Sequence, residues 1–176
     1  MQLLQSRKQL AAWRQGVAGP VHFVPTMGAL HPGHQQLFRR AAEPVVGQRP
    51  LVVASVFVNP LQFGPAEDFE RYPKDLAADA ALAEAAGVTA LFAPAVEEVY
   101  PDGVAALTAI HPPQGLQQVL CGRSRPGHFH GVATVVVRLL NLVRPDRLVM
   151  GEKDWQQLVI LRKVVADLGL PVWVQG

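Results

Sequence analysis

The sequence has a single cysteine, Cys121, among its 176 residues. An intramolecular disulfide and a cysteine-based zinc site are therefore both excluded. Charged residues are also scarce, at 17% of the chain, and the formal net charge is only +2. The lysines and arginines are scattered along the sequence, whereas a nucleic-acid binder usually concentrates them on one face. We therefore expect no nucleic-acid partner.

Long hydrophobic runs are absent as well. A membrane-spanning helix needs about 20 apolar residues, and a run such as LVVASVFV at residues 51–58 is far too short. The first residues, MQLLQSRKQLAAW, lack the apolar stretch and small-residue cleavage site of a signal peptide. We expect a cytoplasmic protein with no membrane partner. Its hydrophobic fraction of 49% suits one globular domain with a substantial core.

What the sequence does contain is an alternation of short apolar runs with helical patterns. The runs are apolar on both faces and predict buried parallel strands at residues 21–25, 51–58, 89–93, 147–150 and 172–174. Helices are predicted between them, over residues 34–46, 74–86, 131–143 and 154–168. Gly87 suits the end of the second of these helices, and Asp154 is a candidate N-cap of the last.

This order of elements predicts the α/β class, a doubly wound parallel β-sheet with helices on both faces. We expect one Rossmann-like domain over residues 1–176. In such sheets ligands bind outside the carboxyl ends of the strands. Two irregular stretches rich in proline and glycine, residues 59–73 and 101–130, are longer than ordinary connections and are candidate binding loops.

The loop after the first predicted strand carries two histidines, His31 and His34, just before a helix. Gly28 and Gly33 permit close approach of a ligand to the backbone. The helix N-terminus offers N–H groups and a partial positive charge, and two imidazoles beside it can donate hydrogen bonds to phosphate oxygens. The loop therefore predicts a polyphosphate site.

Two other interpretations of this loop stay open at this point. His31 and His34 have a spacing that would allow zinc ligation, although no third ligand is obvious nearby. They could also be structural residues that cap or fill a turn. A P-loop is excluded, because the Gly-Lys-Ser/Thr ending is missing.

Two amide side chains, Asn59 and Gln62, follow the second predicted strand. Neutral amides at a strand end can read hydroxyl and carboxylate groups through hydrogen bonds. The alternative for Asn59 is purely structural, since Asn-Pro often forms a turn.

The segment MGEKDWQQL follows the fourth predicted strand. Gly151 permits close approach, Lys153 can meet a phosphate as a point charge, and Asp154 can accept hydrogen bonds from ribose hydroxyls or cap the helix. Gln157 lies one turn further along the same helix face. The alternative is an ordinary solvated helix start.

The segment CGRSRPGHFHGV holds a basic cluster. It could close over phosphates or an acid substrate, or it could be a plain surface loop, and its members are Arg123, Arg125, His128 and His130.

Taken together, five blocks resemble one family. His31-x-Gly33-His34 resembles the H-x-G-H signature of the nucleotidyltransferase superfamily. More narrowly, the chain resembles pantothenate synthetases (pantoate–β-alanine ligases) over its whole length, in the blocks PTMGALHPGH, VFVNPLQFGPAEDFERYPKDLAAD, LFAPAVEEVYP, CGRSRPGHFHGVATVV and GEKDWQQL. The family often has arginine where His130 stands, which puts any role of that residue in doubt.

The resemblance implies roles for individual residues. His31, His34 and Lys153 are the implied catalytic residues, with His34 the proton donor. Gln62 and Gln157 are the implied pantoate contacts, and Gln62 also serves β-alanine. The implied ATP-binding residues are Met27, Gly28, His31, Gly33, His34, Gly151, Glu152, Lys153 and Asp154. Magnesium is expected to arrive with ATP, without a protein metal cage.

The resemblance also implies an activity, namely ATP-dependent condensation of pantoate with β-alanine through a pantoyl adenylate, by a homodimer. The Ser-Ser-Arg-Asn-like segment and smaller C-terminal domain of the family do not follow Gly176. We therefore expect this chain to be the substrate-binding half, with impaired catalysis on its own. The alternatives are another H-x-G-H nucleotidyltransferase, or a non-catalytic pantoate-binding module.

Overall fold

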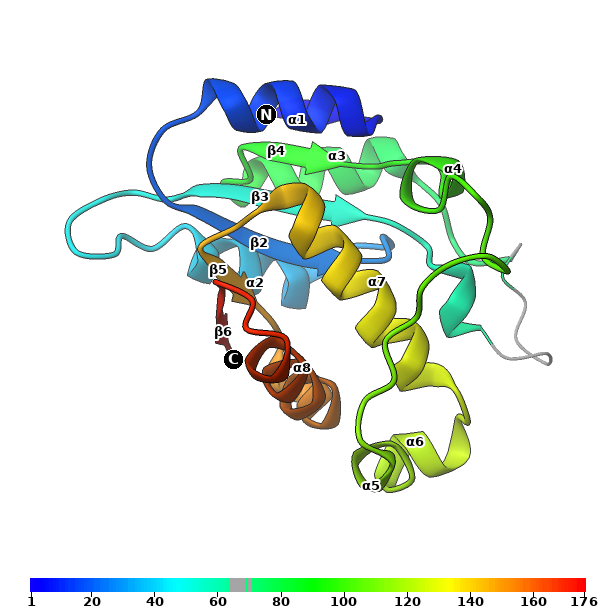
Figure 1. Ribbon diagram of the computed structural model, residues 1–176. Coiled ribbons are helices and arrows are strands. Elements are labelled where there is room, and N and C mark those ends of the chain that lie inside the picture. Colours follow the sequence, from blue (N-terminus) through cyan, green and yellow to red (C-terminus); the bar gives the residue numbers. More distant parts are fainter. Residues whose placement is uncertain (64–68, 70) are drawn as a thin grey trace.

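The structure, a computed structural model, describes residues 1–63, 69 and 71–176 (Figure 1). The predicted irregular stretch at residues 59–73 therefore lies in part outside the described residues.

In the described part of the chain, six strands form one sheet in the order β1-β4-β3-β2-β5-β6, and every neighbouring pair is parallel. The strands are β1 (Gln2–Leu4), β2 (Val21–Thr26), β3 (Leu51–Val56), β4 (Ala90–Phe92), β5 (Arg147–Val149) and β6 (Trp173–Gln175). Five of them match predicted strands to within two residues at each end. The sequence analysis missed the edge strand β1.

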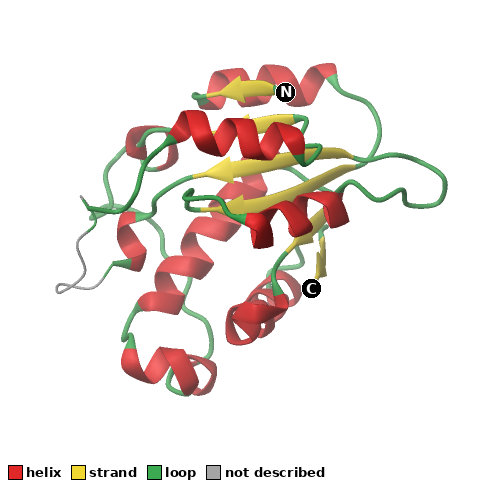
Figure 2. Ribbon diagram, turned by 180° about the vertical axis from the view of Figure 1, so that it is seen from behind, coloured by secondary structure: helices red, strands yellow, loops and turns green. Residues whose placement is uncertain are grey.

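Helices cover both faces of the sheet, as predicted (Figures 1 and 2). One face carries α1 (Arg7–Gly16), α7 (His128–Val143) and α8 (Trp155–Asp167), and the other carries α2 (Pro32–Ala41) and α3 (Leu76–Ala85). Shorter helical turns lie in the connections: η1 (Pro60–Gln62), α4 (Val96–Val99), α5 (Gln114–Gln117), α6 (Leu120–Ser124) and η2 (Glu152–Asp154). The doubly wound α/β class is therefore confirmed.

The hydrophobic core consists of two layers, one on each side of the sheet. Phe23 and Leu148 point into the layer beneath α7 and α8, whereas Val24 packs with Phe38 and Ala41 of α2. Residues that alternate along a strand face opposite sides of the sheet, so a strand covered on both sides must be apolar throughout. Burying each large apolar side chain stabilises the fold by roughly 1.5–3 kcal/mol.

Several predicted boundaries differ from the structure. The helix predicted at residues 34–46 begins two residues earlier, at Pro32, and ends at Ala41, shortly before Pro44. Helix α7 begins three residues before the predicted start, at His128. Residues 101–130 were predicted to be irregular, but α5 and α6 lie within them. Asp154 does precede α8, yet its side chain makes no capping hydrogen bond.

The chain reverses its direction across the sheet between β2 and β5. From β2 it runs through α2 to β3 on one side, whereas α7 leads from the β4 side back to β5 on the other face. Ligand clefts in doubly wound sheets lie at this kind of reversal. Within the described residues, none of the helices is long and apolar enough to span a membrane.

Candidate functional site

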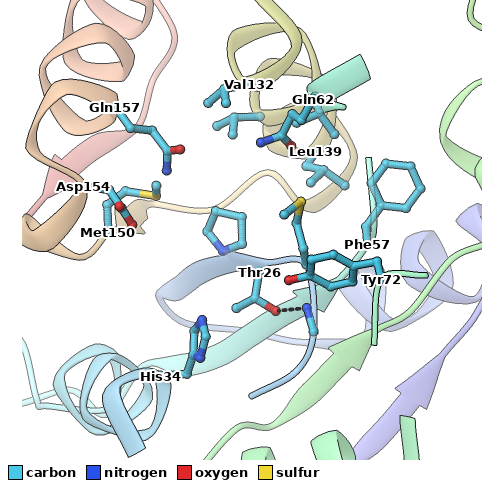
Figure 3. Close-up of a pocket in the computed structure, with 15 residues that line it drawn as sticks. Thr26, His34, Phe57, Gln62, Tyr72, Val132, Leu139, Met150, Asp154 and Gln157 are labelled. Carbon is cyan, nitrogen blue, oxygen red and sulfur yellow. Dashed lines mark hydrogen bonds between the residues drawn. The ribbon is translucent and has the colours of Figure 1, made fainter. Parts of the chain in front are cut away.

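A cavity of about 210 Å³ lies at the carboxyl ends of β2 and β5, where the strand order reverses (Figure 3). The predicted site residues Met27, Gly28, His34, Gln62, Asp154 and Gln157 all line it. The structure thus brings together side chains that are up to 130 positions apart in the sequence.

Gln62 and Gln157 approach this cavity from different elements. Gln62 ends η1 and Gln157 lies in the first turn of α8, and both side-chain amides point into the space between them (Figure 3). Residues of α7, including Val132 and Leu139, together with Phe57, supply an apolar wall. A cavity with an apolar wall and a few converging amides suits a small molecule that has both hydroxyl or carboxylate oxygens and methyl groups.

The histidine loop uses its own rings as helix caps. The His31 ring accepts a hydrogen bond at Nδ1 from the Gly33 backbone N–H at 3.1 Å, and the His34 Nδ1 accepts from the His31 backbone N–H at 3.3 Å. The two ring centroids are 4.1 Å apart. Because a backbone N–H can only donate, each neutral ring must carry its proton on Nε2. Both imidazoles are therefore held as Nε2–H donors.

The start of α2 offers fewer free backbone donors than the sequence predicted. Pro32 has no N–H, the Gly33 N–H bonds to the His31 ring, and the His34 N–H bonds to the His31 carbonyl at 2.9 Å. A Cβ on Gly33 would lie 2.8 Å from the His31 ring, so glycine is needed for this cap. Hydrogen bonds to an anion would come chiefly from imidazole Nε2–H groups rather than from the helix backbone.

His34 is neutral at physiological pH. Burial lowers its pKa from the ordinary value of 6.5, and the positive charge of a protonated His31 would lower the pKa further. Lys153 acts in the same direction, while Asp79 and Asp154 oppose it. His34 therefore acts as a neutral hydrogen-bond donor.

Asp79, a residue that the sequence analysis did not single out, holds the histidine loop in place. Its carboxylate accepts hydrogen bonds from the backbone N–H groups of Ala29 at 3.1 Å and Leu30 at 2.7 Å. Gly28 has a φ of +88°, and a Cβ there would lie 2.9 Å from an Asp79 oxygen. The signal in the sequence was an acidic residue within the alanine-rich run KDLAADAALAEAA. The structure shows that this residue is buried.

Tyr72 was also missed, although it lines the cavity (Figure 3). Burial raises the pKa of its hydroxyl, and Asp79 raises it further. Tyr72 therefore stays protonated and offers the cavity a neutral hydroxyl.

Asn59 is fully buried and forms no direct part of the cavity wall. Its Nδ2 donates to Gln62 Oε1 and to the Gly131 carbonyl, each at 3.1 Å, while its Oδ1 accepts from the Tyr100 hydroxyl at 2.9 Å. Its Oδ1 also accepts from the Leu61 N–H at 3.3 Å, so the interpretation of Asn59-Pro60 as a turn holds too.

The basic cluster at residues 123–130 divides into separate environments. Arg125 Nη2 and His128 Nδ1 both lie 3.3 Å from the Gln62 backbone carbonyl, which they brace. His130 packs against His111, with ring centroids 4.3 Å apart, and its pKa is lowered by burial and then by His111. Arg123 is exposed. The structure thus shows a bracing role for two members of the cluster.

The segment after β5 is divided between the cavity and the surface. Asp154 lines the cavity, whereas Glu152 and Lys153 are exposed residues of η2 that do not. Gly151 and Gly33 also lie outside the lining residues, as does His31 at the loop surface. The charge of Lys153 nevertheless reaches His34, whose pKa it lowers.

The alternative of zinc binding receives no support from the structure. The residues it describes include no group of three or more histidine, cysteine, aspartate or glutamate side chains that could hold a metal ion. The Nδ1 atoms of His31 and His34 are also already engaged by backbone N–H groups.

Comparison with known proteins agrees with this geometry. Residues 2–176 match the sequence model of the family described as pantoate-beta-alanine ligase. A bifunctional pantoate ligase/cytidylate kinase of Parasynechococcus marenigrum is 59% identical over 174 residues, which are 99% of this chain and 34% of that protein.

Two solved structures show the same fold. A pantothenate synthetase from Thermus thermophilus has a TM-score of 0.89 and 51% identity, with 100% of this chain and 61% of that one covered. A pantoate-beta-alanine ligase from Francisella tularensis, complexed with beta-gamma ATP and beta-alanine, has a TM-score of 0.90 and 37% identity, with 99% and 65% covered. The chain thus spans about one third of its bifunctional relative's length and just under two thirds of these solved structures.

Proposed function

Because this chain belongs to the pantoate–β-alanine ligase family, we propose that it supplies the ATP- and pantoate-binding part of an enzyme that condenses pantoate with β-alanine. The observation that carries the proposal is the cavity itself. It is lined by the amides of Gln62 and Gln157, by apolar side chains of α7 and by His34, at the reversal of the sheet. Pantoate combines a carboxylate and hydroxyls with two methyl groups, which suits such a lining.

In the first step, a pantoate carboxylate oxygen attacks the α-phosphorus of ATP. An oxygen–phosphorus bond forms, the bond to pyrophosphate breaks, and pantoyl adenylate results. A carboxyl with an ordinary pKa of about 4 is already ionised at neutral pH, so this step needs no general base. The requirements are alignment of the two substrates and stabilisation of charge on the phosphates.

Residues in and around the cavity fit these requirements. Gln62 and Gln157 would hold pantoate, while the Nε2–H groups of His31 and His34 and the Lys153 ammonium would bind the phosphates. The neutral state of His34 suits a donor that stabilises developing negative charge. In the second step, the neutral amine of β-alanine attacks the acyl carbon, AMP leaves, and the amine loses a proton.

ATP and β-alanine as substrates are supported by the Francisella relative, whose structure is described as complexed with beta-gamma ATP and beta-alanine. We propose that Met27, Gly28 and the residues 151–154 contact the nucleotide. Magnesium would be held mainly by phosphate oxygens and water, and the Asp154 carboxylate is the kind of oxygen ligand that this ion prefers. A homodimer in the cytoplasm is the arrangement we expect from the family.

The experiment is to mix the protein with Mg-ATP and pantoate, without β-alanine, and to measure pyrophosphate release and pantoyl adenylate by mass spectrometry. The expected result is pyrophosphate release that depends on pantoate, even at a low rate, followed by pantothenate formation when β-alanine is added. Pantoate binding without turnover would instead favour a non-catalytic pantoate-binding module. Adenylate formation with a different acid, and none with pantoate, would contradict the proposal.

A further inference from the structure

A buried hydrogen-bond relay leads from Tyr100 through Asn59 to Gln62. The Tyr100 hydroxyl lies 2.9 Å from Asn59 Oδ1, and Asn59 Nδ2 lies 3.1 Å from Gln62 Oε1. Tyr100 is 2% exposed and Asn59 is 0% exposed, so bulk water cannot replace either partner. Only the last member of the relay reaches the cavity.

The direction of every hydrogen bond in the relay is fixed by two backbone groups. The Leu61 N–H, 3.3 Å from Asn59 Oδ1, can only donate, and the Gly131 carbonyl, 3.1 Å from Asn59 Nδ2, can only accept. Asn59 therefore cannot exchange the positions of its oxygen and nitrogen without facing donor to donor and acceptor to acceptor. The second Nδ2 proton of Asn59 must then be donated to Gln62, which has to accept it with its side-chain oxygen.

The same logic applies at the far end of the relay. Because Asn59 presents Oδ1 to Tyr100, the tyrosine hydroxyl has to be the donor. Burial raises the pKa of Tyr100 above its ordinary value, which keeps this hydroxyl protonated. Its ring is independently held, with Phe57 at 6.0 Å between centroids and the Arg138 guanidinium 5.6 Å from the ring centroid.

We propose that Tyr100 and Asn59 are positioning residues that fix Gln62 as a hydrogen-bond donor, so that the site selects a ligand with an acceptor oxygen at that point. With Oε1 engaged by Asn59, the group that Gln62 offers to the cavity is its Nε2 (Figure 3). This inference rests on the proposed function for the identity of the ligand, which is pantoate. It also implies that β-alanine would meet Gln62 through its carboxylate rather than through its ammonium group.

The position of η1 is fixed as well as the orientation of its amide. Gly131 lies so close that a Cβ there would come within 2.2 Å of the Leu61 carbonyl oxygen. Arg125 and His128 lie 3.3 Å from the Gln62 carbonyl. With the backbone held by these contacts, the Asn59 hydrogen bond decides which end of the Gln62 amide faces the ligand.

The test variant is Tyr100→Phe, which keeps the ring and its contacts and removes only the hydroxyl. Its matched control is Thr134→Val, which removes a partly buried hydrogen bond outside the relay, from the Ile110 N–H to Thr134 Oγ1 of α7 at 2.9 Å. Side-chain amide signals of Asn59 and Gln62 are recorded by ¹⁵N NMR without ligand. We expect slow hydrogen exchange at Asn59 in the unmutated protein, with faster exchange and shifted Gln62 signals in Tyr100→Phe only.

Pantoate titration of the same proteins supplies the second readout. Loss of one neutral hydrogen bond should weaken pantoate binding by about 2- to 10-fold in Tyr100→Phe and leave it unchanged in Thr134→Val. Unaltered Asn59 and Gln62 signals in Tyr100→Phe, or equal changes in both variants, would overturn the inference. If neither the unmutated protein nor the two variants bind pantoate, only the proposed function is overturned. The amide signals test the relay separately, because they are recorded without a ligand.

Discussion

The carboxylate of Asp79, on α3, accepts a hydrogen bond from the Leu30 backbone N–H at 2.7 Å and so ties the histidine loop to a different helix. Its other oxygen accepts from the Ala29 N–H at 3.1 Å. Ala29 has a φ of +51°, a strained value for a residue with a Cβ. A buried acceptor that satisfies two adjacent N–H groups compensates for that backbone conformation.

Asp79→Ala should therefore destabilise the protein and loosen the loop. Two partly buried N–H groups would lose their acceptor, and each lost hydrogen bond costs about 1 kcal/mol of unfolding free energy. Urea unfolding measures the loss, and amide hydrogen exchange at residues 29–30 locates it. Asp75→Ala is the matched control, because Asp75 caps the same helix through the Ala78 N–H at 3.0 Å. Asp75→Ala should lower the free energy of unfolding by about 1 kcal/mol and should not speed hydrogen exchange at residues 29–30.

β1 and α1 show how much of the fold could be predicted from the sequence. Five strands were predicted because their apolar runs are buried on both faces. β1 has only three residues, of which Leu4 alone is buried, so no pattern marks it. α1 did carry a signal, since Ser6 and Gln9 form a capping box and Leu10 and Trp13 face the core at helical spacing. That signal was available in the sequence and was missed.

The cavity lining was predictable for residues that closely follow strands, whereas Tyr72 and residues behind the cavity were missed. Gln62, Gln157 and His34 follow strands, and the ends of parallel strands meet at one edge. Asp79 lies 49 residues from Leu30 in sequence, and Tyr100 lies 41 from Asn59. No local spacing relates such pairs, because tertiary packing alone brings them together.

The pH dependence of His34 gives a second prediction. Its pKa in the folded protein lies below 6.5, mainly through burial, so the unfolded chain binds the proton more strongly. Stability should therefore fall as the pH is lowered through about 6.5 and toward 5. An NMR titration of the His34 ring should show a midpoint below 6.5.

The variant His34→Gln should flatten this part of the stability curve. Some slope will remain, since burial also lowers the pKa of His22 and His130. A His34 midpoint at or above 6.5, or an unchanged slope in the variant, would show that its charged form is not penalised by the fold.

The third prediction concerns Lys153. Because the charge of this exposed ammonium reaches His34, Lys153→Met should weaken Mg-ATP binding by roughly 10-fold, which corresponds to about 1.4 kcal/mol, and should leave pantoate binding nearly unchanged. Lys163→Met is the control, since Lys163 pairs with Asp167 at the far end of α8. Calorimetry at two salt concentrations checks both variants. Equal losses of ATP binding in the two variants would point to general charge rather than to a specific phosphate contact.

The central claim is that one cavity binds pantoate between two glutamines, and calorimetric titration with pantoate tests it most directly. The proteins are the unmutated chain, Gln62→Ala, Gln157→Ala and the control Gln156→Ala, whose side chain bonds instead to the Leu116 and Val119 carbonyls. We predict one site per chain, affinity about 10-fold or more weaker in the first two variants, and little change in the control. Absence of pantoate binding by the unmutated chain, or an equal loss in Gln156→Ala, would contradict the account.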